Sequence, residues 1–121
     1  MKSLEFRKNH LNKMLGIAIL ATPHFKLMFS DEILDAEDQE ERQEFTENFH
    51  YQHSVLRKFK DYVYSTNVGV EPDELSEGEL FDLADTLLDV VDTVVENSVR
   101  EQINWLTTEL QDLALSKNQI L

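Results

Sequence analysis

The sequence predicts an all-α protein, a small helical bundle of three long helices plus one or two short ones. With only three glycines and two prolines among 121 residues, the chain has few places to turn. Apolar residues recur at spacings of three, four and seven along most of it, which indicates helices and makes strands improbable. Hydrophobic residues make up 41% and charged residues 29%, a globular composition. We expect one helical domain over residues 1–121.

The first predicted helix begins near the N-terminus. Its apolar residues share one helical face: Leu4, Leu11, Met14, Leu15 and Ala18. Pro23 is expected to end this helix, since proline disfavours helical geometry at the residue before it. The apolar run over residues 14–21 is short and lacks a convincing cleavage site, so we interpret it as a core helix and not as a signal peptide. Residues 25–29 fit either a helical turn or a packed loop.

A second helix is expected to start at Ser30, since a serine can cap orphan amides and the acids that follow it favour the positive end of a helix dipole. Residues 35–44 contain almost nothing apolar, so they form either a solvated helical segment or a loop before a second start. From there the apolar spacing is heptad-like: Phe45, Phe49, Leu56, Phe59 and Val63. This helix is expected to stop near Thr66, where Asn67 and Gly69 supply turn chemistry.

The last long helix is expected after a connection over residues 70–75. Ser76 and Glu79 have the spacing of a capping box, in which each side chain bonds the backbone of the other. The apolar pattern behind this start continues for more than thirty residues: Leu80, Ala84, Leu87, Val91, Val94, Val99, Ile103, Leu106, Leu110 and Leu113. Asn97 and Ser98 mark a candidate bend, but no glycine or proline forces a break between Glu79 and Leu121.

The formal net charge of −13 is concentrated in two stretches. Residues 31–49 carry nine acids against the single Arg42, and residues 71–101 carry eleven against the single Arg100. Residues 1–30 have a net positive charge instead, with five lysines and arginines against one glutamate. An asymmetry of this size bears on binding partners and not on fold.

The sharpest local pattern is an acidic stripe with steps of three and four residues: Asp82, Asp85, Asp89, Asp92 and Glu96. On a helix these carboxylates fall on one face, opposite the apolar one, and extend over roughly 20 Å. Neighbouring like charges repel by a few tenths of a kcal/mol per pair, and no lysine is interleaved. A helix that needs only a soluble face would usually mix signs. The alternative is a solvated face that happens to be acidic.

Catalytic and metal-binding motifs are weak or missing from the sequence. Glu47 and His50 have the Glu-x-x-His spacing of di-iron bundles, but the pattern occurs once, so a chance match explains it better. The basic group Arg57, Lys58 and Lys60, close to His50 and His53, fits dipole compensation in the second half of a helix. There is no Gly-rich phosphate loop and no calcium loop. Without cysteine, neither a disulfide nor a thiolate zinc site can form. We therefore expect no enzymatic activity, cofactor or metal.

A rigid acidic helical surface can occupy a nucleic-acid-binding groove by offering carboxylates where phosphates would sit. We therefore expect a non-enzymatic inhibitor that mimics DNA or RNA and binds the basic surface of a nucleic-acid-binding protein or nuclease. It would not bind nucleic acid itself. The expected partner-binding residues are Asp82, Asp85, Asp89, Asp92 and Glu96, with Glu37, Asp38, Glu41 and Glu44. Small acidic all-helical inhibitors carried by phages, such as anti-restriction or anti-CRISPR proteins, are similar in kind, although no motif matches them residue by residue.

Two alternatives stay open. An immunity or antitoxin protein that masks a basic toxin would share the electrostatics, and Trp105 or Tyr51 would anchor its complex. A structural or regulatory homodimer would instead use the long apolar tract over residues 99–115.

No segment has the twenty or so apolar residues needed to span a bilayer. We expect an intracellular location, which includes an infected host cell. Whether the two acidic clusters lie side by side distinguishes a mimic from a merely soluble protein.

Overall fold

The computed structural model describes the backbone of residues 4–116 and the side chains of residues 8–116. Within this range the chain forms four helices and no strand. They are α1 (Leu4–Leu34), α2 (Gln39–Val68), α3 (Glu77–Thr93) and α4 (Asn97–Ser116). The predicted all-α bundle, with three long helices and one shorter one, is confirmed. The expected contribution of the Leu4 side chain and the expected continuation to Leu121 lie outside the described residues.

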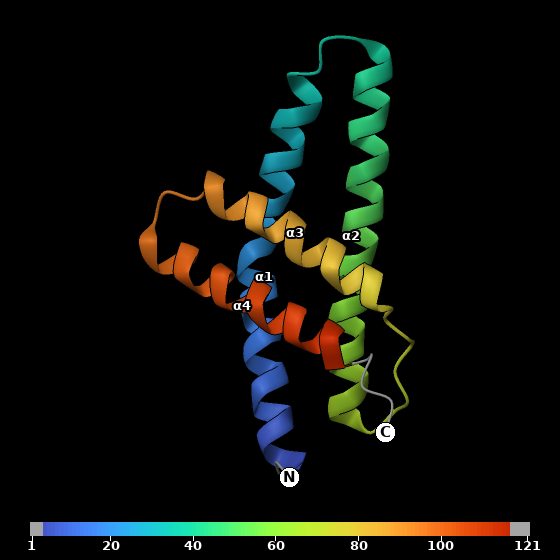
Figure 1. Ribbon diagram of the computed structural model, residues 1–121, viewed down its shortest axis with the longest axis vertical. Helices are drawn as coiled ribbons and strands as arrows, with labels where there is room; N and C mark the ends of the chain where they lie inside the picture. Colours follow the sequence, from blue (N-terminus) through green and yellow to red (C-terminus); the bar gives the residue numbers. More distant parts are fainter. Residues whose placement is uncertain (1–3, 117–121) are drawn as a thin grey trace.

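The four helices form two antiparallel hairpins that cross each other (Figure 1). α1 and α2 lie side by side as a long hairpin joined through residues 35–38, and the shorter hairpin of α3 and α4 crosses its middle. α1 packs against all three other helices, while α2 packs against α1 and α3. The core therefore lies where the two hairpins cross, and the end of the long hairpin that holds the α1–α2 connection extends beyond it.

The prediction that Pro23 ends the first helix is wrong, because α1 continues through it to Leu34. A proline inside a helix costs about 3 kcal/mol, since its nitrogen cannot donate to the carbonyl four residues earlier. Beyond it, Phe25, Met28 and Phe29 are all buried against the core. Each buried side chain of this size contributes about 1.5–3 kcal/mol. Continuing the helix is therefore favourable on balance, and the ring of Pro23 lies on the exposed side of α1.

The predicted helix start at Ser30 is also wrong, because this residue lies in the last turns of α1. The second helix begins instead at Gln39, with Asp38 as its N-cap. The Asp38 carboxylate accepts a hydrogen bond from the Glu41 amide at 2.8 Å, as an N-cap side chain should. Residues 35–38 form the connection between α1 and α2. Of residues 35–44, for which both loop and helix were expected as alternatives, the first four are therefore loop and the rest are helix.

The predicted end of the second helix and start of the next are confirmed. α2 ends at Val68, and Gly69 caps it with the positive φ of 78° that glycine adopts without strain. The Val70 amide then donates to the Ser65 carbonyl at 2.9 Å, which satisfies one of the last free acceptors. At the start of α3, Ser76 and Glu79 form both bonds of the capping box, at 3.0 and 3.1 Å.

The uninterrupted helix expected from Glu79 onward is wrong, since α3 ends at Thr93 and α4 begins at Asn97. Thr93, Val94 and Val95 are β-branched, which lowers helix propensity, and Val94 adopts an extended conformation (φ −92°, ψ 128°). The reversal folds the apolar face of α4 back onto α3 and α1. The buried residues of α4 are Val99, Ile103, Leu106, Thr107, Leu110 and Ala114. This burial outweighs the local preference for a straight helix. It also covers these residues of the apolar tract over residues 99–115 within one copy of the chain, so they are not available for the predicted homodimer contact.

Between the two long helices, the core is aromatic. Phe25 and Phe29 of α1 lie with ring centroids 5.0 Å apart, and Phe49 of α2 lies 5.4 Å from Phe29. His53 stacks beside Phe49 at 5.5 Å.

Across residues 4–116, none of the helices combines the length and the apolar character needed to cross a bilayer.

Candidate acidic interface

The acidic stripe of α3 is exposed along its whole length. Asp82, Asp85, Asp89 and Asp92 all lie on the solvent side of this helix, while Leu80, Leu83, Leu87 and Val90 are buried on the other. The fifth predicted member, Glu96, is not on the helix. It lies in the α3–α4 connection, where its carboxylate accepts a hydrogen bond from Ser98 at 3.2 Å. The stripe therefore consists of four aspartates and not of five carboxylates.

The four aspartates divide into two rows. Asp82 and Asp89, seven residues apart, are turned toward the long hairpin: the Tyr51 hydroxyl of α2 donates to Asp82 at 2.9 Å, and Asp89 lines a cleft with α1. Asp85 and Asp92 lie on the outward side of the same face, rotated by about 60° around the helix axis from the first row. In the inner row, Asp82 therefore faces Tyr51 and Asp89 faces other acidic side chains, while the outer row faces solvent.

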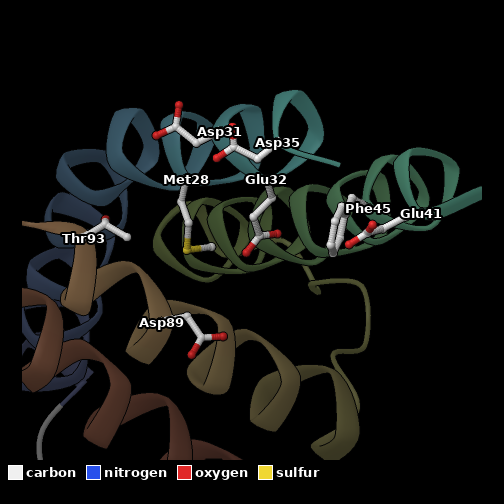
Figure 2. Close-up of a pocket in the computed structure, with 8 residues that line it drawn as sticks. All are labelled: Met28, Asp31, Glu32, Asp35, Glu41, Phe45, Asp89 and Thr93. Atoms are coloured by element: carbon white, nitrogen blue, oxygen red, sulfur yellow. The ribbon is translucent and has the colours of Figure 1, made fainter. Parts of the chain in front are cut away.

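An open cleft of about 440 Å³ lies between the projecting end of the long hairpin and α3. Figure 2 shows Met28 and Glu32 extending from α1 toward α3, and Asp89 on the stretch of α3 that lies opposite them. Five of the eight lining residues are acidic: Asp31, Glu32, Asp35, Glu41 and Asp89. Met28, Phe45 and Thr93 complete the lining. The two acidic clusters of the sequence thus meet at one surface.

The electrostatics of the cleft disfavour ionisation of Glu32. Burial raises the pKa of Glu32 above its ordinary value, and the negative charge of Asp89 raises it further. Thr93, the last residue of α3, and residues 31–35 at the end of α1 also bring two helix C-termini to this region. Helix C-termini carry partial negative charge, and neither of these has a basic residue in its last turn. The N-terminus of α2, whose first turn holds Glu41, carries partial positive charge and opposes these C-termini, so the negative potential of the cleft comes mainly from the carboxylates.

The second group of predicted residues has mainly a local role. Asp38 caps α2, and the Glu41 carboxylate accepts from the Glu37 amide at 3.0 Å, so both acids stabilise the first turn of that helix. Glu41 is the member of the group that also lines the cleft. Glu44 is exposed on α2 outside the lining. The structure therefore brings Glu41 and Asp89 to one site but leaves Glu37 and Glu44 apart from it.

Three acidic residues of the cleft were missing from the predicted site: Asp31, Glu32 and Asp35. The sequence pattern places Asp31 and Glu32 at a helix start, where acids compensate a positive dipole, and Asp35 in the segment open between helix and loop, because Pro23 is expected to end the preceding helix. The run of buried side chains at Phe25, Met28 and Phe29, in register with Ala18 and Ala21, is the signal that could have corrected this. It places residues 31–35 at the C-terminal end of a helix.

Within residues 8–116, no ion pair neutralises a residue that lines the cleft. Between residues 8 and 116 the structure has two ion pairs, Lys58 with Glu79 at 2.8 Å and His10 with Glu109 at 3.0 Å, and neither includes a residue that lines the cleft. Three further cations, Lys26, Arg57 and Lys60, lie together at the α1–α2 seam, where the pKa of Lys60 is lowered by burial and by the charges of Lys26 and Arg57. This basic group is separate from the acidic cleft.

The two aromatic residues proposed as anchors have different environments. Trp105 is half-buried, with His10 edge-on at 5.5 Å and the Lys13 ammonium 4.2 Å from its ring centroid. It packs α4 against α1 and is poorly placed to anchor a partner. Tyr51 is 44% exposed and lies beside the acidic stripe through its bond to Asp82.

Glu47 and His50, at di-iron spacing, are both exposed on α2. Among the side chains that the structure describes, no three His, Asp or Glu residues are arranged to hold a metal ion.

Comparisons of the chain with protein-family models, with curated proteins and with solved structures each found no match.

Proposed function

We propose that this protein is a non-enzymatic acidic inhibitor that binds the basic nucleic-acid-binding surface of a partner protein. The observation that carries the proposal is the meeting of Glu32 and Asp89 across one open cleft, which joins the acidic face of α3 to the acidic end of the long hairpin. Such a continuous negative surface has the charge, and the helical rigidity, that a groove built for phosphates would accept.

The spacing of the stripe supports mimicry. Successive aspartates of α3 lie three or four residues apart, which corresponds to about 5 Å along the helix axis. A nucleic-acid strand presents one phosphate about every 3.4 Å, so lysines and arginines arranged for phosphates would find carboxylates at comparable intervals. The inner row and the cleft would then supply a second line of charge beside the first.

The energetics favour capture of a cationic partner. Like charges that repel in the free protein cost a few tenths of a kcal/mol per pair. A partner that places arginine or lysine side chains between Asp89, Glu32 and the outer aspartates relieves this repulsion on binding. The complementary fields would also speed association at low ionic strength.

The test compares two variants with the same change in charge. The first carries Asp82→Asn, Asp85→Asn, Asp89→Asn and Asp92→Asn. The control carries Asp61→Asn, Asp73→Asn, Glu74→Gln and Asp112→Asn, at exposed acids outside the α3 stripe and the cleft. Each immobilised protein is incubated with cell lysate, and retained proteins are identified and then challenged with duplex DNA or RNA.

We expect the unmodified chain and the control to retain nucleic-acid-binding proteins, and nucleic acid to displace them. The stripe variant should lose at least about tenfold in affinity, because each contact between opposite charges contributes on the order of 1 kcal/mol. Equal retention by both variants, or partners that nucleic acid does not displace, would contradict the proposal.

A second candidate, an immunity protein that masks a basic toxin, is favoured by one observation. Tyr51 is exposed next to Asp82 and presents an aromatic ring at the edge of the acidic surface, as hot-spot residues do. This reading predicts a one-to-one complex that survives high salt and is weakened by Tyr51→Ala more than by the Asp82→Asn variant. A complex that dissociates at high salt would favour the mimic instead.

A further inference from the structure

We propose that this protein forms a twofold homodimer in which the exposed faces of two α1 helices pack antiparallel. The inference does not depend on the proposed function, since it concerns a different face of the molecule. Three leucines of α1 recur at seven-residue intervals on its outer side: Leu20, Leu27 and Leu34, the last two of which are 61% and 75% exposed. Ile19 lies beside them at 56% exposure. Monomeric proteins rarely expose apolar rows of this length without a partner.

Small residues alternate with the leucines. Gly16, Pro23 and Ser30 are also seven residues apart, and all three are exposed on the same face. If Leu27 of one α1 lies opposite Pro23 of a second, antiparallel α1, then Leu20 lies opposite Ser30 and Leu34 opposite Gly16. Every leucine then meets a glycine, a serine or the compact ring of a proline. This register is self-complementary, as a twofold interface requires.

Gly16 has no explanation within one copy of the chain. A glycine inside a helix costs about 1 kcal/mol relative to alanine. A Cβ built at this position would meet nothing within 4 Å, so no neighbour in the same chain requires the missing side chain. In the proposed register the space beside Gly16 is filled by Leu34 of the second copy.

A groove on the same face has the right position for a side chain of the partner. It has a volume of about 230 Å³ and is mainly apolar, lined by Lys26, Phe29, Ser30, Ile33, Leu34 and Phe49. Residues 30–33 face residues 17–20 of the second copy in this register, and Ile19 lies on the flank of the stripe that faces the groove. Ile19 of each copy would therefore fill the groove of the other, while Lys26 at its rim can extend to solvent.

The charges of α1 favour the antiparallel direction. The N-terminal half of the described part of α1 carries Lys8 and Lys13, and its C-terminal end carries Asp31 and Glu32, followed by Asp35. In the proposed register Lys13 lies close to Asp35 of the second copy, and symmetry makes this pair twice. A parallel pairing would bring like charges together at both ends. The acidic ends of the two hairpins would then point in opposite directions.

The primary test is the molar mass in solution, measured by sedimentation equilibrium over a wide concentration range. We expect the unmodified chain to approach the dimer mass, and Leu27→Glu to raise the dissociation constant by about a hundredfold, since symmetry places the change twice in the interface. Val95→Glu adds the same charge at a residue that is 93% exposed in the α3–α4 connection, and should leave the dimer intact. A monomer mass at all concentrations would overturn the proposal.

Two further variants exclude misfolding and test the register. Gly16→Gln should keep or increase helix content and thermal stability but weaken the dimer, because the new side chain occupies the place of Leu34 of the second copy. The chain has no cysteine, so a Leu20→Cys/Ser30→Cys variant can form only introduced disulfides. Oxidation should link two copies of this double variant and neither single variant. Unchanged dimerisation of Gly16→Gln, or cross-linking of a single variant, would contradict this arrangement.

Discussion

Glu32 is the residue at which the two acidic stretches of the sequence interact. It extends from the end of α1 toward Asp89 of α3 (Figure 2), although 57 positions separate them in the chain. Burial is the larger cause of its raised pKa, and the charge of Asp89 adds to it. The folded state therefore binds a proton at Glu32 more readily than the unfolded chain does. By linkage, this residue lowers stability as the pH rises through its folded-state pKa.

Glu32→Gln should stabilise the protein at neutral pH by a few tenths of a kcal/mol, because it removes a like charge from the cleft. The gain should disappear below the ordinary pKa of glutamate, where the carboxyl is neutral in both states. Urea unfolding at neutral and at acidic pH measures the difference. Glu44→Gln, outside the cleft, is the matched control and should give a smaller gain. A loss of stability in Glu32→Gln at neutral pH would contradict this account.

At the scale of elements, α1 shows how burial overrides a local break. Pro23 removes one backbone hydrogen bond, and the residue before it, Thr22, uses its hydroxyl to donate to the Ala18 carbonyl at 2.8 Å. The helix persists because Phe25 and Phe29 are buried beyond the proline. The opposite outcome occurs between α3 and α4, where no proline is present and the chain still reverses at residues 94–96.

Pro23→Ala should raise the free energy of unfolding by about 2 kcal/mol. An interior proline costs about 3 kcal/mol, and part of this gain is offset by roughly 0.4–1 kcal/mol because alanine leaves the unfolded chain freer. Ser30→Ala, on the same exposed face, should add at most about 0.5 kcal/mol. Chemical denaturation of both variants at one protein concentration makes the comparison. If Pro23→Ala were destabilising, the proline would have a packing role that no contact within one copy of the chain accounts for.

At the scale of the whole molecule, charge is separated by position. The acidic cleft lies between α3 and the end of the long hairpin, while Lys26, Arg57 and Lys60 gather on the α1–α2 seam. With a net charge of −13, repulsion opposes the compact state. The described part of the chain relieves this with only two ion pairs.

Added sodium chloride should therefore stabilise the protein, by on the order of 1 kcal/mol between about 0.05 and 0.5 M, since screening weakens several like-charge pairs at once. Urea is the suitable denaturant because it carries no charge. The four-aspartate variant of α3 should show a smaller dependence on salt than the unmodified chain. Stability that falls with salt would mean that attractive pairs dominate the surface.

Local interactions determined the features that sequence alone predicted correctly. The capping box of Ser76 and Glu79 and the turn at Gly69 involve residues only a few positions apart, so their spacing predicts their geometry. The apolar spacing likewise determined which faces of α2 and α3 are buried, and therefore that the aspartates of α3 are exposed. These features hold wherever the helices lie in the fold.

Tertiary structure alone decided where α1 and α3 end and what the acidic stripe faces. The course of α1 through Pro23 and the reversal at Val94 depend on burial against distant residues, which outweighs local propensity by a few kcal/mol. The meeting of Glu32 with Asp89 follows from how the two hairpins cross, and no spacing within either segment encodes it. The sequence by itself determined that this protein is helical and unevenly acidic. Packing decided that two acidic stretches share one cleft and that the outer face of α1 stays uncovered within one copy of the chain.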